Sequence, residues 1–407
     1  MGTVREGQIK RHFGTLADQN QFLFLLITVF TNKVFLFHCF FPTKMKTVFI
    51  VVLLLHGLIH FLGFLKGFGL AEIKQLEISI SRGMAVLWLL AGLCIALFGI
   101  LSLQTSDYAW ILGFVAIALS QLVIISAWSE ARFGTIPNLM MLVAIIIGFG
   151  QWSFKKQISR ETTEIIDSVT GVERSIVDDA QLAVLPKAVQ AWYEASGAAN
   201  KPKVTYAKVK QQALMKMKPD QEKWMEALAV QYTSVEPPAF IWTVEADMNP
   251  LLYFRGRDRF LDGRGQMLIK LNDVVRIVDE SGEKLDEGTI QRYLGELVWF
   301  PSLAFSPYIT WKPVNDTTAI AEMNYKGTTG SGTFYFSENG DFKRFSTWRY
   351  QGNEEERKEW ILDVLEYDTF EGIRVPSLMT ATWRLDEGDW TWLKLEIEDI
   401  EYHFEGS

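Results

Sequence analysis

The chain has 407 residues, of which 49% are hydrophobic and 22% are charged, and its charge is unevenly distributed. Residues 1–152 contain ten basic and six acidic side chains, a net charge of +4, whereas residues 153–407 contain 30 and 42, a net charge of −12. The length predicts two domains, and the acidic second part repels phosphate, which excludes nucleic acid as an expected partner. The two cysteines lie in apolar runs, which excludes a disulfide framework and a cysteine-based metal site.

An apolar stretch at residues 22–41, interrupted by Asn32 and Lys33, precedes Met45. It has two interpretations. It is an extra membrane span in which Lys33 reaches the interface or is paired, or residues 1–44 are an upstream extension and the natural start is Met45. We favour the second, because Met45 and Lys46 followed directly by an apolar run resemble an ordinary membrane-protein N-terminus.

Four long apolar runs follow, and short polar segments separate them. Each is long enough, or nearly so, to cross a hydrocarbon core of about 30 Å as a helix. They predict a four-helix transmembrane domain over residues 45–152, and therefore a multi-pass protein with membrane lipids as partners. The runs are 48–65, 83–103, 108–128 and 136–152.

Positively charged residues give a weak prediction of orientation. With Met45 as the start, lysines and arginines are equally numerous on the two sides of the membrane, at four each. With an extra span, seven lie inside and five outside, which favours an external C-terminal domain. We therefore expect the cytoplasmic membrane as the location, with the second domain on its extracytoplasmic side.

Two histidines, His56 and His60, stand four residues apart in the first run and so share one helix face. Ionisable groups inside a membrane are candidates for ligand binding or proton transfer. The alternative is a pair of neutral imidazoles hydrogen-bonded to neighbouring helices, with Gly57 allowing close packing. We favour this alternative, because the predicted spans contain no carboxylate to complete a ligand set.

Residues 153–171 are polar and predict a juxtamembrane linker, and residues 172–407 predict a soluble α+β domain. Helical spacing of apolar residues indicates helices at 176–195 and 289–300. Alternating segments, separated by Gly-containing turns, indicate a curved antiparallel sheet of eight to ten strands with helices on one face. The predicted strand segments are 208–219, 239–248, 265–279, 319–327, 332–350, 360–370, 375–385 and 390–404.

The second domain holds ten of the fourteen tryptophans. They either fill an ordinary sheet–helix core or line a cavity for an apolar ligand. Arg292 and Glu296 stand four apart on the second predicted helix, with Trp299 a turn further, so they form a structural ion pair or a site for a ligand headgroup. The candidate ligand-binding residues are Trp242, Arg292, Glu296 and Trp299.

Catalytic residue combinations are nearly absent from the second domain. Its only histidine is His403, and it has no cysteine, so nucleophilic triads and histidine-rich metal sites are not expected. The carboxylates that could act as acids lie in turn-rich segments and are expected to be solvated: Asp258, Asp262, Glu280 and Asp286. We expect a protein without a cofactor or metal that is not an enzyme.

Several segments resemble an uncharacterised family of bacterial membrane proteins: HGLIHFLGFLKGFGLAEIKQL, WSEARFGTIPN, RGRDRFLDGRGQMLIKL and QRYLGELVWFPSLAF. The resemblance covers about Met45 to the C-terminus and implies four N-terminal spans followed by an extracytoplasmic β-rich domain. That domain is similar to the half-barrels of lipoprotein carriers, which hold acyl chains in an apolar concavity. Two functions remain as expectations: binding of a lipid, acyl chain or lipoprotein, or a scaffold that recognises another envelope protein.

Overall fold

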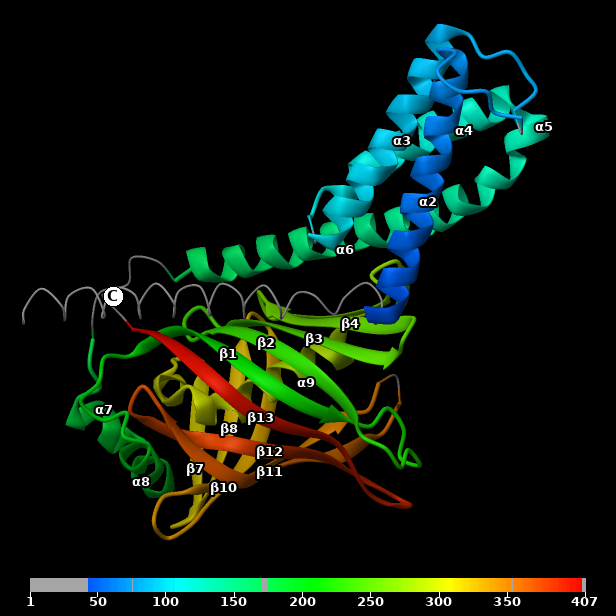
Figure 1. Cartoon of the computed structure of the whole chain (residues 1–407). Helices are drawn as coiled ribbons and strands as arrows, with labels where there is room; N and C mark the ends of the chain where they lie inside the picture. Colours follow the sequence, from blue (N-terminus) through cyan, green and yellow to red (C-terminus); the bar gives the residue numbers. More distant parts are fainter. Residues whose placement is uncertain (1–42, 75, 105, 170–174, 353, 405–407) are drawn as a thin grey trace, which may run out of the picture. The chain divides into compact units, whose positions relative to one another are not determined.

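A computed structural model of the chain describes residues 43–74, 76–104, 106–169, 175–352 and 354–404 (Figure 1). The apolar stretch 22–41, and all but the last two residues of the expected extension 1–44, lie outside the described residues. The chain divides into two compact units, residues 1–152 and residues 153–407. Each unit is described by itself below.

The first unit consists of helices. Four helices are long and apolar enough to cross a membrane, and they coincide with the four predicted runs. The last of them begins within the first unit and continues through residues 153–167 of the second. The helices are α2 (Thr43–Gly67), α3 (Arg82–Leu103), α4 (Ala109–Ser126), the short α5 (Trp128–Ala131) and α6 (Thr135–Asp167).

Close approach of α2 and α3 depends on two glycines. A Cβ atom on Gly92 would lie 2.9 Å from the carbonyl oxygen of Gly57, so a larger residue at this position would push the helices apart. Small residues at such crossings let the backbones of apolar helices come into contact. Leu53, Ile95 and Met141 pack into one cluster beside this contact and are at most 1% exposed.

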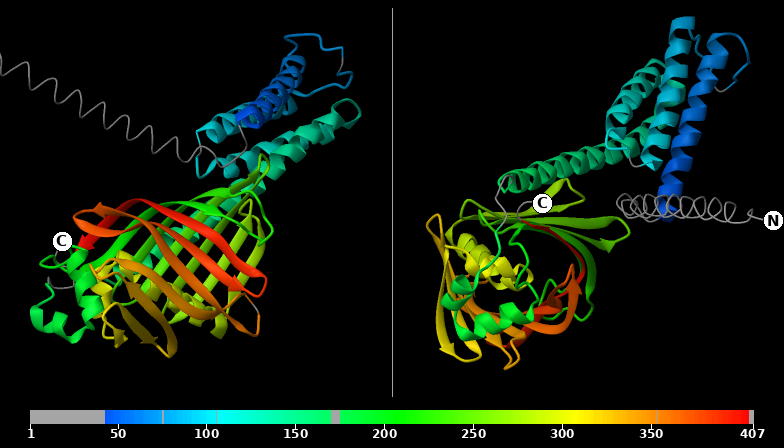
Figure 2. Two further views of the ribbon diagram at one scale, coloured as in Figure 1. Left: turned by 90° about the horizontal axis from the view of Figure 1, so that it is seen from below. Right: turned by 90° about the vertical axis from the view of Figure 1, so that its left-hand side faces the viewer.

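The second unit is a thirteen-stranded antiparallel sheet that curls into a half-barrel (Figure 2). Consecutive strands pair along the sheet except at its centre, where β1 pairs with β13. The strands are β1 (Val204–Met215), β2 (Met225–Ser234), β3 (Ala239–Asn249), β4 (Leu252–Leu261), β5 (Arg264–Leu271), β6 (Val275–Ser281), β7 (Ile309–Asn315), β8 (Thr318–Tyr325), β9 (Thr328–Phe336), β10 (Phe342–Tyr350), β11 (Arg357–Phe370), β12 (Ile373–Leu385) and β13 (Gly388–Phe404).

The curved sheet with helices agrees with the predicted fold class, but it has more strands than the eight to ten expected. Two of the predicted segments are each two strands, and β2, β4 and β7 were not predicted. The inward residues of β2 include small alanines, the middle of β4 consists mainly of charged residues, and β7 contains Pro313. Neither β2 nor β4 has the alternation of large apolar and polar residues on which strand prediction depends, and in β7 Pro313 interrupts the alternation that begins at Ile309.

The helices of the second unit also differ from the predicted ranges. The predicted helix 176–195 is two helices, α7 (Asp179–Val184) and α8 (Lys187–Ala195), because Pro186 interrupts it. The predicted helix 289–300 begins earlier, as α9 (Glu283–Gly295), and continues as 3-10 turns at Glu296–Trp299 and Pro301–Phe305.

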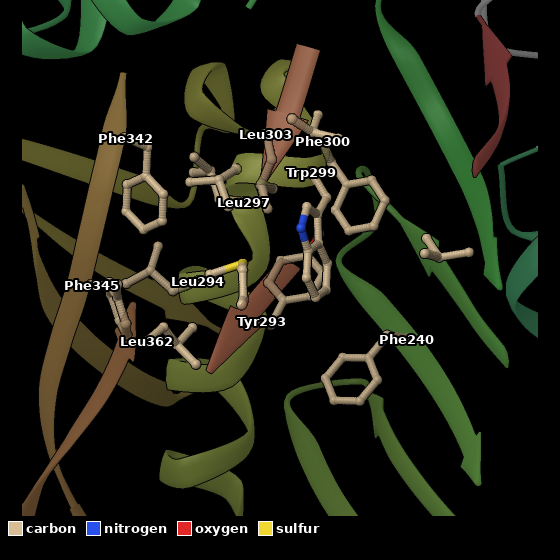
Figure 3. Packing of buried hydrophobic residues seen from close by; sticks show 14 of the residues in the cluster. Phe240, Tyr293, Leu294, Leu297, Trp299, Phe300, Leu303, Phe342, Phe345 and Leu362 are labelled. Atoms are coloured by element: carbon tan, nitrogen blue, oxygen red, sulfur yellow. The ribbon is translucent and has the colours of Figure 1, made fainter. Parts of the chain in front are cut away.

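Helix α9 lies inside the concave face of the sheet (Figure 2). Tyr293, Leu294 and Leu297 are at most 1% exposed and pack with the aromatic residues of the surrounding strands (Figure 3). Two glycines let the helix approach the sheet closely. A Cβ atom at Gly265 would lie 2.4 Å from Thr289 Oγ1, and one at Gly330 would lie 2.6 Å from Ile290 Cγ2.

The opposite face of β3 and β4 is covered by the end of α6. Ile165 packs against Ala239 and Ile241, and all three are at most 1% exposed. Beside them, Glu161 forms an ion pair with Arg257 of β4. The segment expected as a linker, residues 153–171, is therefore helical as far as Asp167 and contributes to the core of the second unit.

Candidate functional site

The concave face of the half-barrel contains a cavity of about 760 Å³. This volume lies within the range of about 300–1,000 Å³ that is typical of small-molecule sites. Apolar and aromatic side chains from β3, β5 and β11–β13 form one part of its wall, and α9 with the acidic end of β6, which includes Asp279 and Glu280, forms another. Six tryptophans line it: Trp242, Trp299, Trp360, Trp383, Trp390 and Trp392.

Three of these tryptophans form a row across adjacent strands. Trp360 of β11 pairs directly with Trp383 of β12, which in turn pairs with Trp390 of β13. Directly opposed residues of neighbouring strands point to the same face, so the register aligns the three indoles. A bulge at Trp392 follows, so that Trp390, Trp392 and Leu393 all line the cavity although strict alternation would turn one of them outward.

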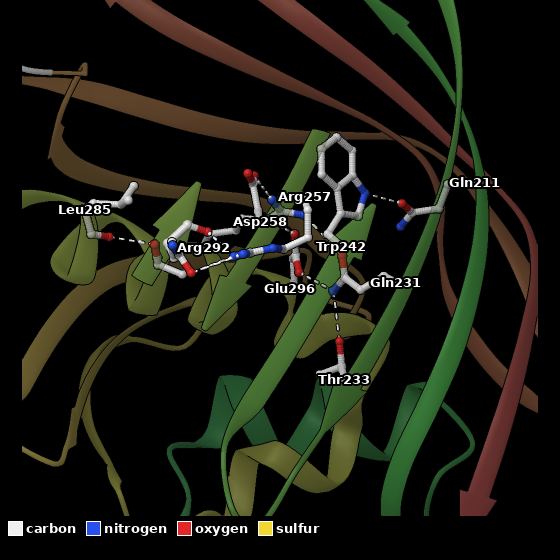
Figure 4. A network of polar contacts seen from close by, with 11 residues as sticks. Gln211, Gln231, Thr233, Trp242, Arg257, Asp258, Leu285, Arg292 and Glu296 are labelled. Atoms are coloured by element: carbon white, nitrogen blue, oxygen red, sulfur yellow. Dashed lines mark hydrogen bonds and ion pairs between the residues drawn. The ribbon is translucent and has the colours of Figure 1, made fainter. Parts of the chain in front are cut away.

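The polar side of the cavity is centred on Arg292 of α9 (Figure 4). Its Nη1 donates to Asp258 Oδ2 at 2.8 Å, its Nε donates to Glu296 Oε1 at 2.7 Å, and its Nη2 donates to Gln231 Oε1 at 3.2 Å. The amide of Gln231 donates in turn to Glu296 Oε2 at 2.7 Å. Arg292, Glu296 and Gln231 thus form a closed hydrogen-bonded ring.

The electrostatics of this network are those of a buried ion cluster. Burial alone would lower the pKa of Arg292, but Glu296 and Asp258 together raise it above its ordinary value. Burial raises the pKa of Asp258 even though Arg292 lies beside it. The guanidinium also stacks on Phe240 and Trp242, 4.9 Å and 4.8 Å from their ring centroids. Three of the five N–H groups of Arg292 are therefore engaged within the protein, and two of these three bind carboxylates.

All four residues predicted to bind a ligand line this one cavity: Trp242, Arg292, Glu296 and Trp299. Two of their polar groups serve the protein itself. The indole N–H of Trp242 donates to Gln211 Oε1 at 2.9 Å, and that of Trp299 donates to the carbonyl oxygen of Pro376 at 3.0 Å. That these residues bind a ligand stays a prediction.

Sequence reasoning missed several residues of the site. Asp258 was expected to be solvated, but its side chain is 21% exposed and paired with Arg292. Asp286 was also expected to be solvated, yet it is 3% exposed and accepts the backbone N–H of Gly265. Gln231 and Arg349 gave no signal in the sequence. For Asp258 the sequence does contain a signal. Phe254, Gly256, Asp258 and Phe260 are two residues apart and therefore face the same side of β4.

The polar residues of the first unit form a separate hydrogen-bonded network between α2, α4 and α6. His56 Nε2 lies 3.0 Å from Asn138 Oδ1 and 3.2 Å from Ser120 Oγ, and His60 Nε2 lies 3.0 Å from Ser120 Oγ. His60 Nδ1 lies 2.9 Å from the carbonyl oxygen of His56. Because a carbonyl only accepts, His60 Nδ1 carries a proton and donates to it, and the Ser120 hydroxyl donates its one proton to Asn138 Oδ1 at 2.9 Å.

This network has the geometry of hydrogen-bonded imidazoles between neighbouring helices. His56, His60, Ser120 and Asn138 are all at most 3% exposed, so the network lies in the interior of the first unit. Among the residues that the structure describes, no group of three or more histidine, cysteine, aspartate or glutamate side chains could hold a metal ion.

The fold and its cavity define a class of protein: a curled antiparallel half-barrel with an internal helix, in a chain that also has four apolar helices. The sequence pattern of a family of unknown function, DUF6544, matches residues 175–395, and the chain belongs to this family. The uncharacterised family expected from the sequence is thereby confirmed. The curated proteins include no match to the chain.

A solved structure of a LolA superfamily protein from Nitrosomonas europaea is similar to this one. The two have 10% sequence identity and a TM-score of 0.31, and the match covers 56% of this chain and 94% of that protein. The half-barrel is defined by its own strand order and register.

Proposed function

We propose that the half-barrel binds a lipid or another apolar ligand in its cavity, and that the four apolar helices hold it at a membrane. The observation that carries this proposal is the cavity of about 760 Å³ with six tryptophans in its wall. A solid core would bring these side chains into contact with each other, because protein interiors pack with few voids larger than a water molecule.

The energetics favour retention of such a ligand. Burying a chain of about fourteen methylenes at about 0.8 kcal/mol each gives about 11 kcal/mol before the costs of association.

Helices that span a membrane would keep the cavity close to a source of acyl chains. We place the protein in the cytoplasmic membrane with the half-barrel on its extracytoplasmic side, which a reporter enzyme fused after Ser407 and active only outside the cytoplasm would test.

A cavity-filling substitution tests the binding proposal. Ala381 lines the cavity and is 2% exposed, so Ala381→Leu places three additional carbon atoms inside it. Ala183, exposed on α7, provides the same substitution at a position outside the cavity. The full chain, purified in a neutral detergent, is titrated with a fatty acid that carries bromine on its chain, and quenching of tryptophan emission is recorded.

We expect saturable quenching in the wild type and in Ala183→Leu, and weaker quenching in Ala381→Leu, because the added side chain occupies the volume of the ligand. Equal quenching in all three proteins would mean that the quencher reaches only tryptophans outside the cavity. That result would contradict binding within the half-barrel and would favour a scaffold that recognises another envelope protein.

A further inference from the structure

Arg349 is a cation of the cavity wall that stacks on aromatic rings. It lies on β10 and lines the cavity. No hydrogen bond or ion pair joins it to another residue in the part of the chain that the structure describes, and its Nε is fully buried. Its nearest neighbours are aromatic: the guanidinium carbon lies 4.7 Å from the ring centroid of Trp360 and 5.6 Å from that of Trp383.

The fold makes room for this guanidinium next to α9. A Cβ atom on Gly288 would lie 2.8 Å from Arg349 Nη2, so only glycine at this helix position leaves the space. Stacking on indole rings compensates part of the cost of removing a cation from water, but it does not satisfy the N–H donors. Burial, together with the nearby Arg292, lowers the pKa of Arg349 from its ordinary value, so a counter-charge beside it would be favourable.

The remaining unpartnered polar atoms of the cavity are of the same kind. The indole Nε1 atoms of Trp390 and Trp392 are buried and have no hydrogen-bond partner among the described residues. Every buried side-chain N or O atom of a lining residue that lacks a partner is therefore an N–H donor, and none is an acceptor. These nitrogens are shielded from the cavity by the protein itself; of the Arg349 guanidinium only Nε is shielded in this way, so its terminal nitrogens are the donors that a ligand in the cavity can reach.

Arg292 cannot take this role, although it was the cation expected to meet a headgroup. Its ion pairs with Asp258 and Glu296 place two carboxylates against it, at 2.8 Å and 2.7 Å, and a further anion there would meet like charges. Arg349, in contrast, has no carboxylate within ion-pairing distance among the described residues. It is the cation of this wall that is free to bind an oxyanion.

We propose that the cavity binds an anionic amphiphile whose carboxylate or phosphate group is held by the guanidinium of Arg349. Its apolar part lies against the row of Trp360, Trp383 and Trp390. This assignment rests on the proposed function of the half-barrel, and it specifies the chemical class of the ligand. Charge-assisted hydrogen bonds from a guanidinium to an oxyanion would supply the selectivity.

The test compares ligands that share a chain and differ in the headgroup. The full chain in a neutral detergent is titrated with oleate, with oleyl phosphate and with methyl oleate, and tryptophan emission reports binding. We expect the wild type to bind both anions at least tenfold more tightly than the ester. Inorganic phosphate alone should bind far more weakly than oleyl phosphate, and equal affinity would overturn the assignment of an amphiphile.

Two variants locate the selectivity at Arg349. Arg349→Gln should bind methyl oleate as the wild type does and lose the preference for the anions. Arg344→Gln is the matched control, because Arg344 lies on the same strand, is 44% exposed and pairs with Asp363; it should keep the preference. Binding of the ester reports that the cavity is folded, and Arg349→Met replaces Arg349→Gln if the latter does not fold.

The outcomes separate this inference from the proposed function. A wild type that binds the ester as tightly as the anions, or an Arg349 variant that keeps the tenfold preference, would overturn the role of Arg349 and leave apolar binding intact. Failure of all three chain-bearing ligands to bind the wild type would overturn both.

Discussion

Arg257 and Glu161 form an ion pair that is almost completely shielded from water. Arg257 Nε lies 3.1 Å from Glu161 Oε2, and the two side chains are 1% and 5% exposed. Gln266 Oε1 accepts from both terminal nitrogens of the guanidinium at 3.1 Å, so the cation is well surrounded by acceptors. This pair joins the end of α6 to the outer face of the half-barrel.

Removing one partner of this ion pair should destabilise the second unit strongly. Glu161→Ala leaves the Arg257 guanidinium buried without its counter-charge, which costs about 3–5 kcal/mol. Asp386→Ala is the control: it breaks the pair with Lys358, in which the carboxylate is 87% exposed, and should cost less than about 1 kcal/mol. Denaturant unfolding of the full chain measures both, and equal effects would show that α6 does not pack on β4.

The stability contribution of Asp258 should rise as the pH falls. Burial raises the pKa of this carboxyl in the folded protein above its value in the unfolded chain, so the folded state takes up the proton first. Between about pH 7 and about pH 4, the free energy of unfolding of the wild type should therefore increase relative to Asp258→Asn. A relative decrease, as for a carboxylate whose pKa is lowered by an ion pair, would contradict the raised pKa. Thermal unfolding of both proteins across this range measures the difference.

The hydroxyl group of Ser120 lies within hydrogen-bonding distance of the Nε2 atoms of both His56 and His60. Ser120→Ala removes the hydroxyl that donates to Asn138 Oδ1 and lies 3.2 Å and 3.0 Å from the Nε2 atoms of His56 and His60, and should destabilise the helices of the first unit by about 1–2 kcal/mol. Ser126→Ala on the same helix is the control, because Ser126 donates only to the carbonyl oxygen of Val123. Thermal unfolding in detergent compares them, and identical midpoints would show that the histidine network contributes nothing to stability.

Part of the candidate site follows from local sequence spacing. Arg292, Glu296 and Trp299 stand four and three residues apart, and this spacing alone places them on one face of a helical segment. The structure keeps them on one wall of the cavity although the last of them belongs to a 3-10 turn. The long apolar runs likewise predict α2, α3, α4 and α6, because the length needed to cross a membrane is a property of each segment by itself.

The rest of the site depends on pairing between distant segments. Asp258 meets Arg292 only because Asp258 lies on the concave face of β4, against which α9 packs, and the charged residues around Asp258 are also typical of a solvated turn. Arg349 gives no local signal, since a lone arginine before Tyr350 is ordinary on an exposed strand. The bulge at Trp392 shifts which residues face inward, and no alternation pattern predicts such a shift.

Photo-cross-linking in intact membranes shows whether the cavity holds a lipid. Benzoylphenylalanine replaces Trp392, which lines the cavity, or Trp348, which is 63% exposed on β10, so that both variants exchange one large aromatic residue for another. After irradiation, mass spectrometry of the full chain should find an adduct with the mass of a lipid at position 392 and none at position 348. Absence of a lipid adduct at position 392, or equal labelling at the two positions, would contradict a lipid-binding cavity.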